Sequence, residues 1–109
     1  MKQIFNSEQF DKEKTENSLL LVYFSGINCG VCQTLKPKIE TLVKENFPTV
    51  NLVEIPTNKA MELAAQFRMF SIPAVMLFVE GREYLREVRN INTSNLMNRM
   101  EKIVNLYRN

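Results

Sequence analysis

The tetrapeptide Cys29-Gly30-Val31-Cys32 constrains this chain more than any other stretch, because it joins an apolar run to a helical pattern. The six residues from Leu19 to Phe24 are all apolar, which predicts a strand covered on both faces, as in a parallel sheet. From Gly30 onward, apolar side chains recur at helical spacing, so a helix should begin at the motif. Unpaired N–H groups and the helix dipole stabilise a thiolate there. We therefore expect Cys29 to be the nucleophile and Cys32 the resolving thiol.

Both cysteines of the chain lie in this motif, and the chain contains no histidine. Tetrahedral zinc sites need four ligands and iron–sulfur clusters commonly need four thiolates, so one chain alone completes neither. A cysteine pair in a cytosolic protein is more often catalytic or metal-binding than structural. Redox chemistry is the favoured interpretation, and a metal bridging two copies or a pair of inert thiols are the alternatives. We expect no metal and no cofactor beyond a redox-active Cys29–Cys32 disulfide.

The remaining composition is that of an ordinary folded domain. A length of 109 residues predicts a single domain over residues 1–109. The net charge is only +2, with both signs interspersed, which argues against a nucleic-acid-binding surface. The apolar runs are too short to span a membrane, and the N-terminal residues lack the pattern of a secretory signal. We expect a cytoplasmic monomer.

The residue pattern predicts alternating strands and helices. Glu80-Gly81 should connect two antiparallel strands as a two-residue hairpin turn. Pro37 falls inside the helix that follows the motif and should bend or interrupt it. Ser7 is the expected cap of the first helix. Strands are expected at residues 2–5, 19–24, 51–55, 74–79 and 83–88, and helices at 7–15, 30–47, 60–67 and 93–107. This order predicts an α/β fold in which a central mixed sheet has helices on both faces.

With these elements in place, the chain resembles the thioredoxin family over essentially its full length. The shared features are a Cys-Gly-X-Cys motif after a buried strand, Pro37 eight residues after Cys29, Ile72-Pro73 ahead of a hairpin, and the hairpin glycine Gly81. The resemblance implies a thioredoxin-like fold and a protein-disulfide reductase. It implies protein disulfides as substrates and recycling by a thioredoxin-reductase-type enzyme or another thiol reductant.

The resemblance also implies a substrate groove beside the motif. Pro73 would be a cis proline next to the cysteines, and a cis peptide bond is physically plausible only before proline. Ile72 would offer backbone groups to an extended substrate segment. The expected substrate-binding residues are Asn28, Gly30, Val31, Ile72, Pro73 and Arg89. The alternative to an enzyme is a binding module that holds a partner in the Pro73 groove, with regulatory or non-catalytic cysteines.

Four positions depart from the usual thioredoxin pattern. Asn28 replaces the tryptophan before the first cysteine, and Val31 replaces the proline within the motif, which removes a constraint on φ. Arg89 replaces a loop glycine, so the groove should be narrower and more positive. Tyr23 replaces the buried acid of the central strand, and a neutral phenol cannot act as the carboxylate base for Cys32. We therefore expect no buried carboxylate under the motif, proton removal through water or another group, and a weaker reductant than ordinary thioredoxins.

Overall fold

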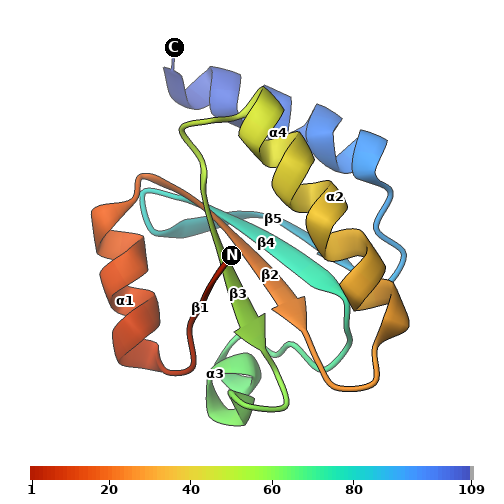
Figure 1. Cartoon of the computed structure of the whole chain (residues 1–109). Coiled ribbons are helices and arrows are strands. Elements are labelled where there is room, and N and C mark those ends of the chain that lie inside the picture. The colour runs from red at the N-terminus through yellow and green to blue at the C-terminus, as the bar shows by residue number, and fades with distance from the viewer. Residues whose placement is uncertain (109) are drawn as a thin grey trace.

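Five strands form one sheet and four helices pack against it (Figure 1). The computed structural model describes residues 1–108. Each element lies close to its predicted position, and the predicted mixed sheet is confirmed. In chain order the elements are β1 (Lys2–Gln3), α1 (Ser7–Glu16), β2 (Leu19–Ser25), α2 (Gly30–Asn46), β3 (Asn51–Pro56), α3 (Met61–Gln66), β4 (Ala74–Val79), β5 (Arg82–Val88) and α4 (Thr93–Arg108).

The strand order in the sheet is β1-β3-β2-β4-β5. β1 and β2 run parallel to β3, whereas β4 is antiparallel to β2 and β5 is antiparallel to β4. β2 therefore lies in the middle of the sheet, and all seven of its residues are buried. A strand that is covered on both faces has no solvent-facing side chains, which explains its continuous apolar run.

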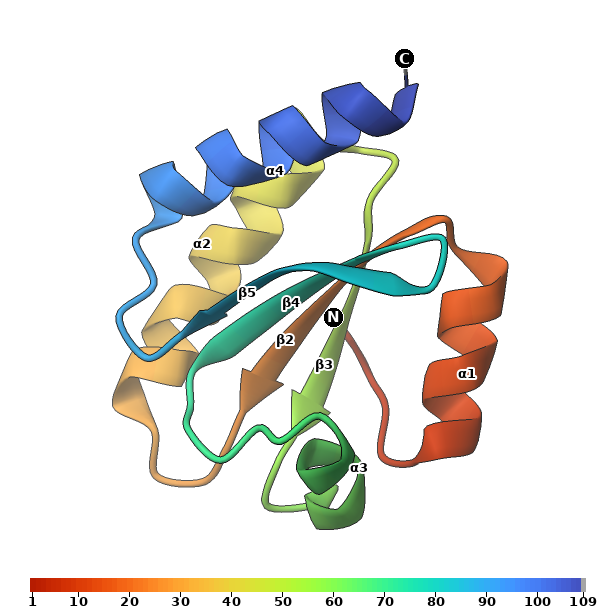
Figure 2. The same ribbon diagram turned by 180° about the vertical axis from the view of Figure 1, so that it is seen from behind.

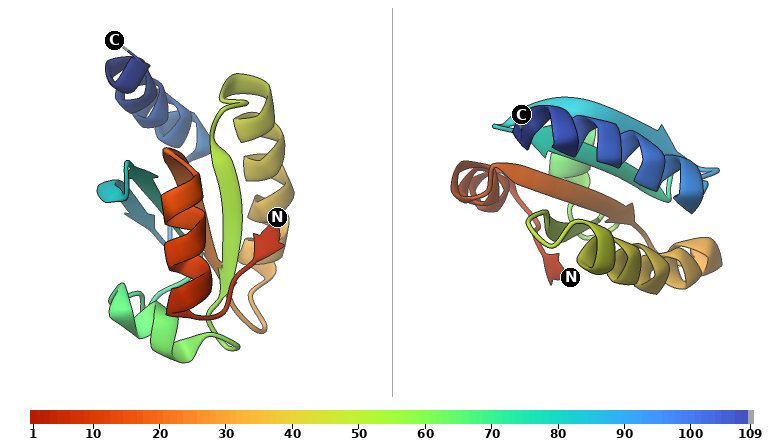
Figure 3. Two further views of the ribbon diagram at one scale, coloured as in Figure 1. Left: turned by 90° about the vertical axis from the view of Figure 1, so that its left-hand side faces the viewer. Right: turned by 90° about the horizontal axis from the view of Figure 1, so that it is seen from above.

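Helices cover both faces of the sheet, as the sequence predicts. Successive strand residues point to opposite faces. Leu21 and Tyr23 of β2 belong to an apolar cluster with α2 and α4, whereas Val22 and Phe24 belong to a second cluster with α1 and α3. Figure 2 shows the sheet from behind, and in the side view of Figure 3 the strand β3 runs between α1 and α2.

The start of α1 differs from the sequence-based expectation, and of the two expected effects of Pro37, a bend or an interruption of α2, the interruption does not occur. The cap of α1 is Asn6, whose side chain accepts a hydrogen bond from the backbone N–H of Gln9 at 2.9 Å. Ser7 instead donates to the side chain of Gln66. The proline in α2 does not end the helix, which continues to Asn46. Pro37 is exposed, so water can reach the carbonyl group that lacks an N–H partner.

The topology brings four loops to one end of the sheet. Because β2 and β3 are parallel, Ser25 and Pro56 end their strands side by side. β4 begins at this end, where Ala74 pairs with Phe24, and β5 ends there, where Val88 pairs with Ala74. We call this the motif end and define it by the loops at residues 26–29, 57–60, 67–73 and 89–92, together with the first turn of α2 at residues 30–33. The first of these loops delivers the cysteine motif to the start of α2.

Candidate active site

The two cysteines form a disulfide at the start of α2. Their Cα atoms are 5.2 Å apart. Cys29 is the N-cap residue of α2, and its Sγ accepts a hydrogen bond from the backbone N–H of Cys32 at 3.2 Å. Cys32 is only 2 % exposed, whereas Cys29 is partly exposed. An incoming sulfur atom therefore has better access to Cys29 than to Cys32.

A second loop of the motif end packs against the loop that carries Cys29. The Ile72–Pro73 peptide bond is cis, and the carbonyl oxygen of Pro73 accepts a hydrogen bond from the backbone N–H of Arg89 at 2.8 Å. A Cβ atom at Gly26 would lie 2.4 Å from Cδ1 of Ile72. A side chain at position 26 would push the end of the Ile72 side chain aside, so glycine allows this close approach. The Gly26–Ile72 contact thus places the cis-proline loop beside the motif.

The other expected substrate-binding residues lie on these loops or in the first turn of α2. Asn28 and Gly30 are exposed next to the cysteines, and the side chain of Val31 is 62 % exposed. Arg89 is exposed beside the Pro73 loop, where its guanidinium donates to Oγ of Ser71 at 3.1 Å. The structure therefore gathers all six expected residues at the motif end.

Tyr23 lies beneath the motif and positions the first turn of α2. Its hydroxyl donates to the carbonyl oxygen of Cys32 at 2.7 Å. Burial, assisted by the negative charge of Glu54, raises the pKa of Tyr23 to about 12. Tyr23 is therefore a neutral hydrogen-bond donor, as the sequence predicts.

The expectation that no buried carboxylate lies under the motif is wrong. Glu54 on β3 is only 5 % exposed and pairs in register with Tyr23. Its carboxylate accepts hydrogen bonds from Oγ of Ser25 at 2.6 Å, from Nζ of Lys36 at 2.7 Å and from Nε2 of Gln3 at 3.3 Å. Burial alone would raise the pKa of Glu54, but these hydrogen bonds and the positive charge of Lys36 outweigh it and lower that pKa. The group is therefore a carboxylate at neutral pH.

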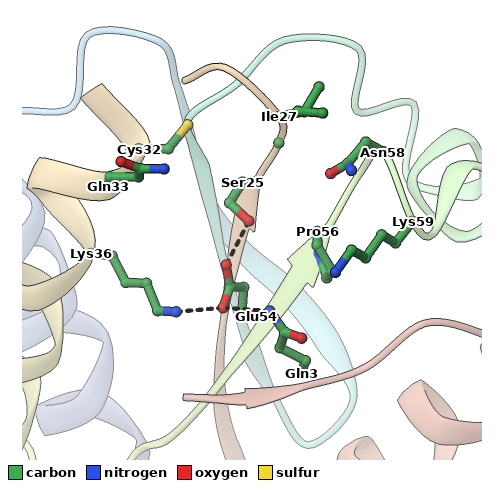
Figure 4. Close-up of a pocket in the computed structure, with 11 residues that line it drawn as sticks. Gln3, Ser25, Ile27, Cys32, Gln33, Lys36, Glu54, Pro56, Asn58 and Lys59 are labelled. Atoms are coloured by element: carbon green, nitrogen blue, oxygen red, sulfur yellow. Dashed lines mark hydrogen bonds and ion pairs between the residues drawn. The ribbon is translucent and has the colours of Figure 1, made fainter. Parts of the chain in front are cut away.

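Glu54 and Cys32 line one cavity of about 370 Å³ (Figure 4). Lys36 follows Cys32 by four residues on α2, so both side chains lie on the same helix face. Figure 4 shows Lys36, Ser25 and Gln3 pointing toward the Glu54 carboxylate, with the Cys32 side chain on the wall of the cavity. The Glu54 carboxylate and the Cys32 side chain therefore border the same space.

The sequence contains one signal for Glu54 that could have been used. An acid between Val53 and Ile55 interrupts an otherwise apolar strand, and such an acid needs partners when it is buried. The partners could not be found in this way, because Ser25, Lys36 and Gln3 lie on three other elements. Their approach to Glu54 depends on the strand order and on the packing of α2.

Residues 1–108 lack two kinds of feature. Within this part of the chain, no group of three or more Cys, Asp or Glu side chains could hold a metal ion. No helix in the same part combines the length and the apolar character that a membrane crossing requires.

Comparison with known proteins agrees with the resemblance. The family model described as Thioredoxin matches residues 2–102. A thioredoxin from Chlamydia trachomatis is 32 % identical over 88 residues, which cover 81 % of this chain and 84 % of that protein. The thioredoxin-like protein YdfQ from Bacillus subtilis is 29 % identical over 92 residues, which cover 84 % of this chain and 81 % of that protein.

Solved thioredoxin structures share the fold at lower identity. The thioredoxin of Trypanosoma brucei brucei superimposes with a TM-score of 0.84 at 22 % identity, covering 94 % of this chain and 89 % of that chain. The thioredoxin of Fasciola hepatica gives a TM-score of 0.82 at 24 % identity, covering 93 % of this chain and 98 % of that chain. The chain therefore belongs to the thioredoxin family, and Cys29 and Cys32 form the disulfide of a thiol–disulfide oxidoreductase.

Proposed function

We propose that this protein is a protein-disulfide reductase in which Cys29 attacks the substrate and Cys32 resolves the complex. The observation that supports these roles is the difference in exposure: Cys29 is partly exposed at a helix N-terminus, and Cys32 is buried behind it. The helix N-terminus stabilises the thiolate of Cys29 in the reduced protein.

The reaction is a pair of thiol–disulfide exchanges. The Cys29 thiolate attacks one sulfur of a substrate disulfide, so a Cys29–substrate bond forms while the substrate S–S bond breaks. The departing substrate thiolate takes a proton from water. Cys32 then loses its proton and attacks the Cys29 sulfur, so the Cys29–Cys32 disulfide forms while the Cys29–substrate bond breaks. The second substrate sulfur leaves as a thiolate and takes a proton from water. Two electrons pass to the substrate, and an external thiol reductant returns them to the protein.

Glu54 is the group best placed to receive the Cys32 proton. Its carboxylate shares the cavity with Cys32 and is ionised at neutral pH. Lys36 offsets its negative charge at 2.7 Å, so a thiolate at Cys32 does not face an uncompensated carboxylate. The proton passes through water in the cavity.

The substrate segment lies across the motif and the Pro73 loop in this proposal. Val31 offers apolar surface to the segment. Asn28 and Gly30 leave the approach to Cys29 open. Arg89 lies at the edge of this binding surface. Ile72 and Pro73 form its floor beside the disulfide. Their shared location at the motif end supports this assignment.

We also propose that residues 1–109 form a single domain that acts as a cytoplasmic monomer. Two apolar clusters on one sheet support the single domain. A cysteine pair confined to one catalytic motif fits a reducing compartment. Sedimentation at several concentrations and cell fractionation test these two properties.

Insulin-disulfide reduction with dithiothreitol tests the activity. The wild-type protein should accelerate precipitation of the insulin B chain, and Cys29→Ser should abolish the acceleration. Cys32→Ser should instead accumulate a mixed disulfide through Cys29. No acceleration by a folded, reduced wild-type protein would contradict the proposal and would leave the binding module as the alternative function.

A further inference from the structure

The charges at the motif end have one sign only. Three of the chain's fourteen basic residues, Lys59, Arg68 and Arg89, lie in the four loops there, and none of its twelve acidic residues does. All three are exposed. Within residues 1–108 none of the three forms an ion pair, and the bond of the Arg89 side chain is to the neutral Ser71.

The carboxylates that flank these loops do not neutralise them. Glu54 is buried and held by Lys36. Glu87 forms an ion pair with Arg99 at 3.0 Å. Within residues 1–108, Glu62 in the first turn of α3 forms no ion pair with these three cations, and it lines a separate pocket between α1 and α3. The motif end therefore presents three positive charges to solvent without an acidic partner among its own loops.

Large apolar side chains are exposed at the same end. Ile27 is 69 % exposed, Val31 62 % and Phe70 80 %. Figure 1 shows the segments that carry them around the tips of β2 and β3. A partner segment that covers this surface would bury apolar area and would meet positive charge at its margin.

Two of the three cations occupy backbone positions that favour glycine. Arg68 has a φ of 54° and Arg89 a φ of 69°, both in the left-handed region. Arginine adopts this conformation at a conformational cost that glycine avoids. Glycine at these two positions would favour folding more than arginine does. The presence of two arginine side chains there therefore fits a role in binding and not in stability.

We propose that the motif end recognises a disulfide-bearing segment of a protein partner in which acidic residues accompany apolar ones beside the target cysteine. This inference rests on the proposed reductase function and names the substrate class. Opposite charges speed diffusional encounter and fix the register of an extended segment, whereas like charges oppose both.

Three synthetic peptides with the same cyclic disulfide and the same apolar residues test the preference. They differ in two flanking positions, which are both Glu, both Gln or both Lys. The second-order rate of reaction with the fully reduced protein is measured by stopped flow. The Glu peptide should react about tenfold faster than the Lys peptide at low salt, with the Gln peptide between them. The ratio should fall toward one at high salt, because ions screen exposed charges.

Matched variants locate the effect. The triple variant Lys59→Gln, Arg68→Gln, Arg89→Gln should lose most of the Glu-over-Lys ratio. The control triple variant Lys12→Gln, Lys44→Gln, Lys102→Gln has the same net charge and should keep it. The three control lysines are exposed on α1, α2 and α4, outside the motif end. Circular dichroism verifies folding, and the salt series on wild-type protein tests the preference without any variant.

The possible results distinguish the acidic preference from the reductase function on which it rests. Equal rates for the three peptides, or a faster Lys peptide, would overturn the acidic preference while leaving the reductase intact. An equal loss of the ratio in both triple variants would overturn the assignment to the motif end. Failure of the protein to reduce insulin and all three peptides would refute the reductase function, and the inference would fall with it.

Discussion

At the scale of single residues, the ion pair between the buried Glu54 and the half-buried Lys36 sets the charge of the cavity that Cys32 lines. A carboxylate buried alone in an apolar cavity is driven toward its neutral form, whereas Lys36, Ser25 and Gln3 keep this one ionised. The pair has almost no net charge, so it can stand beside Cys32 without opposing its thiolate. The expectation of a weaker reductant rested in part on the absence of a buried carboxylate, and Glu54 is such a carboxylate.

Glu54→Gln should slow the resolving step about ten- to a hundredfold, because glutamine keeps the shape of the side chain and cannot accept a proton. Rapid quenching with an alkylating reagent, followed by mass spectrometry, measures the mixed disulfide over time. The mixed disulfide should accumulate in the variant, while the first attack by Cys29 keeps its rate. Glu54→Asp should restore part of the rate, and Glu45→Gln on the exposed face of α2 is the control. If both steps slow equally, Glu54 has only a structural role.

Acid should destabilise the protein partly through Glu54. Its pKa in the folded state lies below the ordinary value of 4.5, so the unfolded state binds more protons between the two values. The contribution of Glu54 to stability is therefore present above pH 4.5 and is lost as the pH falls through the folded-state pKa. Urea unfolding at a series of pH values should show a shallower acid loss for Glu54→Gln than for wild type. Parallel curves for the two proteins would argue against this linkage.

At the scale of elements, the sequence predicts the strands and helices well because each one shows its own periodicity. β2 is apolar throughout because both of its faces are covered. α2 shows one apolar stripe because only one of its faces is covered. The failures concern interactions between elements. Nothing local brings Lys36 to Glu54 or Ile72 to Gly26, because both contacts need the finished sheet. The choice of Asn6 over Ser7 as a cap depends on a shift of one residue that periodicity does not resolve.

The end of α3 shows a local cost that can be measured. Arg68 follows the cap residue Phe67 with a φ of 54°, and the backbone N–H groups of Arg68 and Met69 donate to Ala65 and Ala64 at 2.9 Å. This is the Schellman arrangement, in which glycine normally takes the left-handed position.

Arg68→Gly should therefore raise the free energy of unfolding by about 1 kcal/mol, measured by urea denaturation. Arg68→Ala is the matched control, since alanine removes the same side chain and keeps the backbone cost. An equal gain for both substitutions would show that the effect comes from the arginine side chain and not from the backbone.

At the scale of the whole molecule, β2 joins two apolar clusters that lie on opposite faces of one sheet. Ile39 of α2 is fully buried in the first cluster, and Leu63 of α3 is 1 % exposed in the second. Successive residues of β2 belong alternately to the first and the second cluster. If β2 leaves the sheet, both clusters are therefore exposed to water. The two faces should therefore unfold together as one cooperative unit.

Ile39→Ala and Leu63→Ala test this coupling. Each should lower the free energy of unfolding by about 2–5 kcal/mol through lost burial and an unfilled cavity. The chain has no tryptophan, so tyrosine fluorescence is its intrinsic probe, and Tyr23 is the fully buried tyrosine within the first cluster. In Leu63→Ala, which changes only the second cluster, the transition seen by tyrosine fluorescence should shift as far as the transition seen by far-ultraviolet circular dichroism. A fluorescence transition that stays at its wild-type midpoint while the circular-dichroism transition moves would show that the two faces unfold separately. The single-domain proposal would then be wrong.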